Sequence, residues 1–397
     1  MGKSAPAAIP GSLEPPRLVA HVVPQLDAAG AALLDLIAHM PAERYRHAVL
    51  CLGEHSAWHA HLRERGVEVV DLKRRPGLDP AYYLRMYRAL RALRPDLVHT
   101  RSPGSLGSLD DQLVAALAGV RLRVHGACAR ETPPLLRRAR LGLLRRALRR
   151  LVKHFIAASA EQERWLIEQV GAAPTRVTQI SAGVDSIEFH PRLGPPAAVG
   201  PAGFMQDDVF VIGSVGRMDE ASNELTLVEA FLRLIASPHP AHQRLRLLIV
   251  GDGPLRTECR AMLERAGAGE RAWLPGSRRD TAQLMRSMDL MVLPGLRADT
   301  PDTLLEAMAS ALPVVASAVG VHRELVQPGL TGILVPPMSP EVLAAAIADY
   351  CRIPEMGRRH GARARGQVIA HHSLPAMARN YIAVYDALAQ EAAPARR

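Results

Sequence analysis

The feature that most constrains the fold is a rhythm in which short apolar runs alternate with longer amphipathic stretches along most of the chain. The short runs are apolar at consecutive positions, which is typical of strands covered on both faces. The longer stretches have the apolar spacing of surface helices. This order predicts an α/β protein built on parallel sheets with helices on both faces.

The rhythm stops once, in a stretch rich in proline and glycine at residues 189–206, and then restarts. A length of 397 residues also exceeds one ordinary core, so we predict two doubly wound domains. Ligands of such sheets bind beyond the carboxyl ends of the strands. The predicted segments are a flexible tail (1–16), a Rossmann-like domain (17–190), a linker (191–206), a second such domain (207–375) and a helix (376–397) that packs back on the first domain.

The composition limits the kinds of partner that the chain can bind. A formal net charge of +10 indicates an anionic partner such as nucleic acid, a phosphate-rich ligand or a membrane surface. Aromatic residues make up only 4%, too few for a platform that stacks bases, so we expect no nucleic acid. The four cysteines (Cys51, Cys128, Cys259 and Cys351) have no CxxC spacing, which excludes a disulfide framework or zinc ribbon and favours a reducing, cytoplasmic location.

Glycines and an arginine follow two strands of the second half. Gly216 and Arg217 end one strand, and Gly251 and Gly253 flank Asp252 at the end of the next. A glycine lets a backbone approach a ligand closely, and the alternative is a tight turn from strand to helix. Arg217 offers either a cation for an anionic ligand or a surface salt bridge.

Residues 301–311 (PDTLLEAMASA) are the most suggestive segment. We expect Asp302 or Thr303 to cap a helix, whose free N–H groups would form an anion site. Glu306 lies one turn into this helix. It is either a ligand contact or an ordinary solvated glutamate.

A basic run from Leu135 to His154 holds seven arginines and one lysine and no acid, with leucines at helical spacing. It predicts a basic amphipathic helix that contacts anionic lipid headgroups or a lipid-diphosphate acceptor at the inner face of a membrane. The alternative is a solvated helix packed on its leucine face.

Three histidines lie close together at His55, His59 and His61. Two of them could hold a metal at i, i+4 spacing, but no carboxylate beyond Glu54 is spaced to join them. We therefore expect no metal.

Collinear runs across the second half carry a family resemblance: GSVGR, RLLIVGDGPLR, LPGSRRDTAQLMRSMDLMVLPG and LLEAMASALPVVASAVGVHRELVQPGLTGILVPP. They resemble the donor-binding half of a retaining family 4 glycosyltransferase of the GT-B fold. In the first half AERYRHAVLCL, LRPDLVHTR, EQERWLIEQVG and GVDSIEFHP resemble the sugar transferases associated with PEP-CTERM/exosortase exopolysaccharide systems. The resemblance implies two doubly wound Rossmann-like domains facing a central cleft, a nucleotide-diphosphate sugar as donor, a glycan or lipid-linked acceptor, and no cofactor.

The resemblance also implies roles for single residues. Gly216 and Arg217 would meet the donor diphosphate, and Glu306 would meet the donor ribose. Arg217 and Glu306 are the expected catalytic residues, helped by the backbone amides of residues 303–305. The full implied donor-binding set is Gly216, Arg217, Gly251, Gly253, Arg278, Thr303, Leu304, Leu305 and Glu306.

Four positions depart from the family pattern. Ser222 stands where the family has a second diphosphate lysine, and Ala298 where it has a sugar-contacting glutamate, with Asp299 shifted by one. Cys128 replaces a histidine, and Ala182 replaces an asparagine. These losses affect chemistry and spare the packing segments.

Two functions therefore remain open at this point. The first is a retaining glycosyltransferase of exopolysaccharide or cell-surface polysaccharide biosynthesis. The second is a catalytically impaired relative that binds nucleotide or glycan as a scaffold. A dinucleotide-dependent oxidoreductase is disfavoured, because no GxGxxG follows the first strand.

Overall fold

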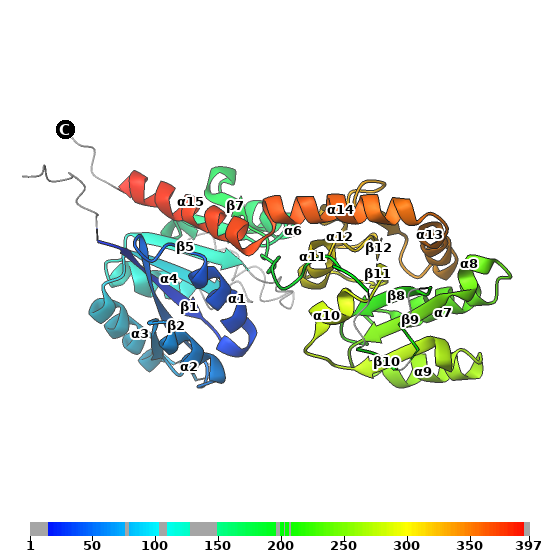
Figure 1. Ribbon diagram of the computed structural model, residues 1–397. Helices are drawn as coiled ribbons and strands as arrows, with labels where there is room; N and C mark the ends of the chain where they lie inside the picture. Colours follow the sequence, from blue (N-terminus) through cyan, green and yellow to red (C-terminus); the bar gives the residue numbers. More distant parts are fainter. Residues whose placement is uncertain are drawn as a thin grey trace, which may run out of the picture. The chain divides into compact units, whose positions relative to one another are not determined.

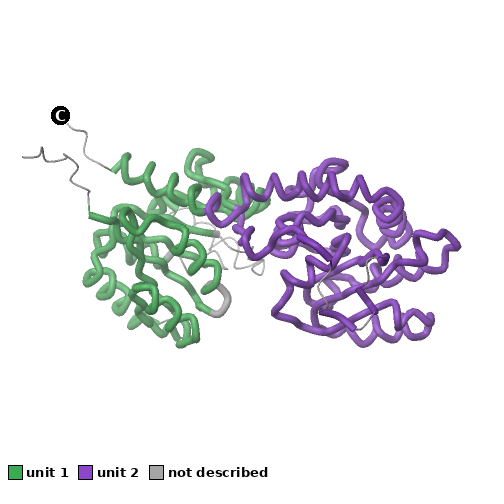
Figure 2. Tube along the Cα trace, viewed as in Figure 1, with its two compact units in different colours: residues 1–180, 378–397 green, residues 181–377 purple. Residues whose placement is uncertain are grey.

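The computed structural model describes residues 15–75, 79–102, 109–127, 149–195, 199–201, 203–205 and 208–392. Figure 2 shows the two compact units into which the chain divides: unit 1 comprises residues 1–180 and 378–397, and unit 2 comprises residues 181–377. Residues 191–206, expected as a linker, fall within unit 2 by this division. Phe189 and Phe204, which flank most of this stretch, are buried in the core of that unit.

Unit 1 is built on a parallel sheet, of which β1, β2, β5 and β7 are labelled in Figure 1. The sheet has seven strands in the order β3-β2-β1-β4-β5-β6-β7. The first six strands follow the order of a Rossmann sheet, as the rhythm of the sequence predicted. The strands are β1 (Arg17–Val23), β2 (Tyr45–Cys51), β3 (Glu68–Asp71), β4 (Leu97–Ser102), β5 (Leu122–Ala127), β6 (His154–Ala157) and β7 (Val177–Gln179). The helices are α1 (Leu26–Ala38), α2 (Ala57–Glu64), α3 (Pro80–Leu93), α4 (Leu109–Leu117), α6 (Ala160–Trp165) and, from residue 378 on, α15 (Leu374–Ala392), with short helices η1 (Arg149–Leu151), η2 (Leu166–Val170) and η3 (Pro174–Arg176).

Both faces of this sheet are covered, which explains its unbroken apolar strands. Val49 and Cys51 of β2 pack with Leu33 of α1 and Leu62 of α2 on one face. Neighbouring residues of the same strands pack with α3 and α4 on the other face: Ala20, Val22, Leu50 and Val98 against Tyr82, Met86, Leu90, Val114 and Ala115. The residues alternate between faces because successive strand side chains point in opposite directions.

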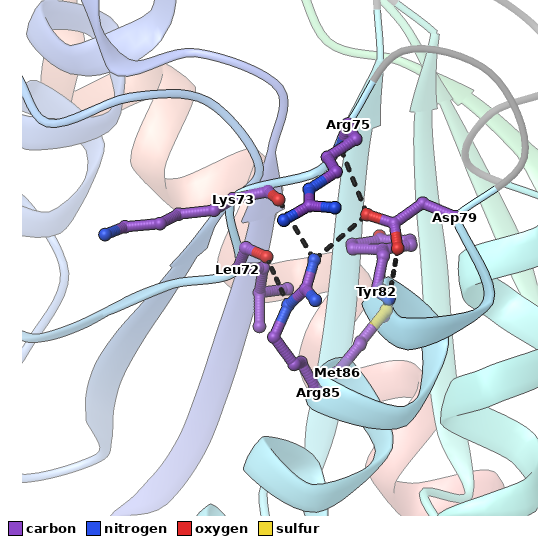
Figure 3. Close-up of polar contacts among 7 residues, drawn as sticks. All are labelled: Leu72, Lys73, Arg75, Asp79, Tyr82, Arg85 and Met86. Atoms are coloured by element: carbon purple, nitrogen blue, oxygen red, sulfur yellow. Dashed lines mark hydrogen bonds and ion pairs between the residues drawn. The ribbon is translucent and has the colours of Figure 1, made fainter.

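The segment after β3 is tied to the start of α3 by a set of charged hydrogen bonds (Figure 3). Asp79 is the N-cap of α3, and its carboxylate accepts from the backbone N–H groups of Tyr82 and Arg75, each at 3.0 Å. Arg85 donates to the same carboxylate and to the carbonyl oxygens of Leu72 and Lys73. Such a cap satisfies N–H groups that the first helical turn leaves without partners. These bonds fix the chain directly after Asp71.

Unit 2 is a second parallel sheet, with strand order β10-β9-β8-β11-β12-β13. Counted within the unit, this is again the Rossmann order, which reverses direction between β8 and β11. Its strands are β8 (Phe210–Val215), β9 (Leu245–Val250), β10 (Ala272–Gly276), β11 (Leu290–Leu293), β12 (Val314–Ser317) and β13 (Gly332–Val335). Its helices are α7 (Glu224–Ile235), α8 (Pro240–Gln243), α9 (Arg256–Arg265), α10 (Thr281–Met285), α11 (Asp302–Ala309), α12 (His322–Leu325), α13 (Pro340–Arg352) and α14 (Pro354–His371), with η4 at Gly269–Arg271.

The core of unit 2 also has two layers. Ile212 and Leu247 pack with α7, α9 and α13 on one face of the sheet. Val211 and Leu248 pack with α10, α11 and α14 on the other face. The carboxyl ends of the strands are therefore held between two helical layers, and the segments that follow them form one edge of the unit.

Two local predictions need correction. The basic helix was expected to reach His154, but residues 149–151 form a short 3-10 helix and His154 is the first residue of β6; the rest of that run, 135–148, lies outside the described residues. The helix expected to be capped by Asp302 or Thr303 instead begins at Asp302, with Pro301 as N-cap and no side-chain cap. The predicted flexible tail lies almost wholly outside the described residues.

No helix among the described residues combines the length and the apolar character needed to cross a membrane.

Candidate functional site

Two adjacent pockets open at the carboxyl edge of the sheet in unit 2. We call them the Gly251 pocket, of about 650 Å³, and the Ser222 pocket, of about 360 Å³. Val215 and Gly216, at the end of β8, line both. They lie beside the point where the strand order reverses, which is where doubly wound sheets bind their ligands.

The Gly251 pocket is formed by the segments that follow β8, β9 and β10. It contains four of the residues expected at the donor, Gly216, Arg217, Gly251 and Gly253, and a fifth, Arg278. Backbone hydrogen bonds join the three segments: the N–H of Gly216 donates to Val250, that of Met218 to Asp252, and that of Gly251 to Gly276. The floor of this pocket is therefore formed by backbone segments that are hydrogen-bonded to one another.

The glycines of this pocket have different tasks. A β-carbon on Gly251 would lie 1.7 Å from the carbonyl oxygen of Gly216, and one on Gly253 would lie 2.3 Å from that of Met218. Those two glycines are required by packing between protein segments. A β-carbon on Gly216 would meet nothing within 4 Å, so this glycine leaves open space for a ligand.

The Ser222 pocket collects the segments after β8 and β11 and the start of α11. It contains Gly216, Ser222, Ala298, Thr303 and Leu304, which the sequence assigned to one donor site. The N–H of Leu296 donates to the carbonyl of Ala221 at 2.7 Å, and that of Val321 to the carbonyl of Ala298 at 3.0 Å. The two positions that depart from the family pattern, 222 and 298, thus share one pocket.

Each arginine that lines the pockets is paired with an aspartate two residues further along. Arg278 donates twice to Asp280, at 2.8 and 2.7 Å. Arg297 donates to Asp299 at 2.9 Å, and Nε of Arg217 lies 3.4 Å from Asp219. These pairs offset much of the positive charge that an anionic ligand would meet.

Glu224 is a site residue that the sequence reading missed. It lines the Ser222 pocket at the start of α7, is 2% exposed, and its Oε2 has no hydrogen-bond partner among the described residues. Burial, with a smaller contribution from Asp219, raises the pKa of Glu224 to about 8. The side chain is therefore a neutral acid at pH 7, able to donate a hydrogen bond into the pocket.

His322 is a second residue that was missed. It lines the same pocket, and its Nδ1 lies 3.1 Å from the carbonyl oxygen of Ser317. Burial lowers its pKa, so the ring is neutral at pH 7. Since a carbonyl only accepts, Nδ1 carries the proton and Nε2 is left as an acceptor. No local sequence pattern marks Glu224 or His322, because each reaches the pocket only when segments that are distant in sequence fold together.

Glu306 lies on α11 but is absent from the lining of both pockets. Burial raises its pKa to about 7, and the nearby Asp302 and Glu188 add to the shift. Leu305, its neighbour, is 1% exposed and belongs to the core, so it can offer a ligand only its backbone.

Two further positions that the sequence singled out are Ala182 and Cys128. Ala182 lies in the segment after β7 and lines neither pocket, and Cys128 lies outside the described residues. One metal-type cluster occurs in the part of the chain that the structure describes, in unit 1, and it is treated separately below.

Comparison with known proteins identifies the family. The sequence model described as Glycosyltransferase Family 4 matches residues 29–187, and the one described as Glycosyl transferases group 1 matches residues 209–352. The chain belongs to the group 1/family 4 glycosyltransferases. The two matches fall on the two Rossmann-like units, and the second contains both pockets.

Curated relatives of this family are similar over part of their length. A D-inositol 3-phosphate glycosyltransferase of Geodermatophilus obscurus is 30% identical over 250 residues, covering 60% of this chain and 54% of the relative. The lipopolysaccharide core biosynthesis mannosyltransferase LpcC of Rhizobium leguminosarum bv. viciae is 28% identical over 289 residues, covering 64% and 80%. The chain thus spans about half the length of the first of these relatives.

A solved structure shows the same fold. HepE of Anabaena, in complex with UDP, has a TM-score of 0.74 at 18% identity, with 93% of this chain and 99% of that chain covered. The two parallel Rossmann-like sheets confirm the predicted GT-B fold class.

Proposed function

We propose that the chain transfers a sugar from a nucleotide-diphosphate sugar to a glycan or lipid-linked acceptor, with retention of anomeric configuration. The observation that carries this proposal is the pair of pockets that share Gly216 at the reversal point of the sheet. A donor with a nucleoside in one pocket and a sugar in the other would place its diphosphate over Gly216. HepE, which has the same fold, is solved with UDP and with UDP-glucose, which supports a donor of this class.

For this reaction, the site must stabilise the negative charge of the departing diphosphate. Arg217 and Arg297 can each direct a guanidinium at it, and Thr303 and Leu304, at the start of α11, line the Ser222 pocket, where their backbone N–H groups could bind an anion. Positioned donors of this kind contribute roughly 10² to 10³ in rate each when charge develops on the leaving group. Glu306 would accept from the donor ribose, as the family resemblance implies.

The acceptor belongs to surface polysaccharide biosynthesis in this proposal. LpcC is a mannosyltransferase of the lipopolysaccharide core, and the first-half motifs resemble transferases of PEP-CTERM/exosortase exopolysaccharide systems. An acceptor embedded in a membrane would explain the basic run that begins at Leu135. This run would hold the protein at the inner membrane face.

A second candidate is a relative that binds the nucleotide without useful turnover. It is favoured by the charge of the Ser222 pocket. Ser222 stands where the family pattern has a lysine and Ala298 where it has a glutamate, and Asp299 is paired with Arg297. Loss of several charge stabilisers together would lower turnover far more than binding.

A nucleotide panel tests the binding part. Thermal shift with UDP, GDP, ADP and NAD should show stabilisation by a nucleoside diphosphate, weakened in Arg217→Ala and in Glu306→Ala. Arg233→Ala is the matched control, because Arg233 pairs with Glu341 and lines neither pocket. Stabilisation by NAD alone would contradict the proposal and revive an oxidoreductase.

Turnover separates the two candidates. Labelled UDP- and GDP-sugars are followed for transfer or hydrolysis with the full chain. Release of nucleotide that is lost in Arg217→Ala supports the enzyme, and binding without any release supports the scaffold.

A further inference from the structure

A cluster of metal-binding side chains lies in unit 1, far along the sequence from the donor pockets. Cys51, His59 and Asp71 each present one ligand atom, and these atoms all lie within 4.8 Å of one another. Nε2 of His59 lies 2.6 Å from Oδ1 of Asp71. His55 adds a fourth ligand atom nearby, with its Nδ1 3.8 Å from Oδ2 of Asp71 and its ring centroid 4.2 Å from that of His59.

One βαβ unit builds the whole cluster. Cys51 and Asp71 are the last residues of β2 and β3, and they are paired with each other across the two parallel strands. They share the sheet face on which Leu62 of α2 packs, as shown by Val49 and Val69 two residues before each of them. His59 lies in the first turn of α2, the helix that connects the two strands. The three ligands therefore converge without help from any other part of the chain.

We propose that Cys51, His59 and Asp71, with His55 as fourth ligand, form a binding site for a zinc-type divalent cation. Thiolate, imidazole and carboxylate together suit Zn²⁺, which binds sulfur at about 2.3 Å and nitrogen or oxygen at about 2.0–2.2 Å in tetrahedral geometry. Ligand atoms in such a site are roughly 3.3–3.6 Å apart. The His59 and Asp71 atoms, 2.6 Å apart, must separate by less than one ångström, and the Cys51 sulfur, within 4.8 Å of both, must approach by at most about 1.5 Å.

The surroundings of His59 suit a metal ligand. Its Nδ1 accepts from the backbone N–H of Ser56 at 3.0 Å and also lies 3.1 Å from the carbonyl oxygen of Ser56. With a metal on Nε2, the ring proton moves to Nδ1 and is donated to that carbonyl, as in many metal-bound histidines, and the backbone N–H of Ser56 loses its bond to the ring. Binding also converts the Cys51 thiol to a thiolate, and its proton leaves to solvent.

Asp71 is held in place from the other side. The carbonyl oxygens of Leu72 and Lys73, directly after it, accept from Arg85, which is itself bonded to Asp79 (Figure 3). Fixed supporting residues of this kind preorganise a site. Cys51 and His59 are fully buried, whereas the side chains of Asp71 and His55 are 23% and 62% exposed. A cation would therefore enter past His55.

The sequence alone pointed away from a metal, because no carboxylate beyond Glu54 is spaced to join the three histidines. The carboxylate that completes the cluster is Asp71, twelve residues after His59 and brought to it by the return of the chain into β3. His61 is not a ligand; it lies against Trp58 and Glu64.

The test uses the full chain, purified reduced and stripped with a chelator, and titrated with Zn²⁺ and with Co²⁺. We expect one Zn²⁺ per chain, and a Co²⁺ complex with the intense visible bands of tetrahedral geometry and a thiolate charge-transfer band. Cys51→Ser should remove the charge-transfer band. Asp71→Asn should weaken Zn²⁺ binding by more than about tenfold, since even an outer partner is worth 10- to 100-fold.

Matched controls locate the site. Cys259→Ser alters a buried cysteine of unit 2, and His61→Ala alters a neighbouring exposed histidine; both should bind as the unaltered chain does. Zn²⁺ binding that is absent, or that is unchanged in both Cys51→Ser and Asp71→Asn, would overturn the proposal. If Cys51→Ser fails to fold by circular dichroism, Asp71→Asn and His55→Ala decide the question.

Discussion

The backbones of Gly251 and Gly216 approach so closely that a β-carbon on the first would lie 1.7 Å from the carbonyl oxygen of the second. Gly251 also has a φ of +146°, which side-chain-bearing residues rarely adopt. We expect Gly251→Ala to lower the free energy of unfolding by about 2–5 kcal/mol, from strain and overpacking together. Denaturant unfolding measures the change.

A glycine of the same unit provides the contrast. A β-carbon on Gly366, inside α14, would meet nothing within 4 Å. Gly366→Ala should leave stability unchanged or raise it by up to about 1 kcal/mol, because alanine is the better helix former. Equal losses in both variants would show that the contact at Gly251 does not matter.

Ser222→Lys should strengthen nucleotide diphosphate binding. The substitution returns a cation to a pocket whose one lining arginine, Arg297, is paired with Asp299. A hydrogen bond to a charged group contributes about 1.5–3 kcal/mol, so we expect a Kd for UDP at least about tenfold lower by calorimetry. Uridine, which lacks the diphosphate, is the control and should bind equally to both proteins. An equal increase in the affinity for uridine would show that the lysine does not act on the diphosphate.

Glu306 should make donor binding depend on pH near neutrality. Its pKa is raised to about 7, chiefly by burial, and a ribose hydroxyl donates best to the ionised form. About nine-tenths of the side chain is ionised at pH 8 and about one-tenth at pH 6. The Kd of UDP-glucose should therefore rise up to about tenfold as pH falls over that range. Glu306→Gln should abolish the dependence, and an unchanged pH profile would separate Glu306 from the donor.

Glu224 should make donor binding weaken as pH rises above neutrality, which is the opposite of the effect expected from Glu306. Burial raises its pKa to about 8, so raising the pH through this value places a new negative charge in the Ser222 pocket. Binding of UDP-glucose should weaken between pH 7 and 9 as the two negative groups repel each other. Glu224→Gln cannot ionise and should keep its affinity. A loss at high pH that persists in this variant would have another origin.

Unit 1 should lose stability in acid. Burial, the largest cause in each case, lowers the pKa of His47 and His125 to about 4, and those of His21 and His99 well below the usual value. The unfolded chain binds these protons near pH 6.5, so the unfolded state gains protons first as pH falls from 7 towards 4. Each group should cost about 1–2 kcal/mol by pH 5.

Tryptophan fluorescence can follow this loss in a Trp273→Phe background, which leaves Trp58 and Trp165 as reporters in unit 1. His47→Gln should make the fall in unfolding midpoint between pH 7 and pH 5 smaller. His61→Gln, at an exposed position, should leave it unchanged. A midpoint that does not move between the two pH values would mean that the buried histidines are protonated in the folded state.

The sequence predicted the parts of the fold that depend on local patterns. Apolar runs located the central strands, and the glycines after β8 and β9 marked the edge where the pockets open. It also placed positions 222 and 298 at one site, and both line the Ser222 pocket. These features follow from residues that are close in sequence or share a strand end.

What the sequence missed depends on contacts between distant segments. Burial of Glu224 results from packing around α7, and the arginine–aspartate pairs needed the turn geometry of each loop. Gly251 and Gly253 line the Gly251 pocket, but the close backbone contacts that also require these two glycines could not be predicted from the sequence. The partner of His59, which lies on α2, is likewise a residue of a separate element, Asp71 at the end of β3.

The return of α15 to unit 1 has a consequence for how the chain is made. Asp386 accepts from Arg17, Arg44 and Tyr45, and the hydroxyl of Tyr385 bonds to His99. These two residues leave the ribosome after all of unit 2, whose residues 181–377 need about 10–40 s of synthesis. During that interval the nascent first unit holds His99 and Arg44 without these partners. Unit 2 can therefore finish folding before the unit that precedes it.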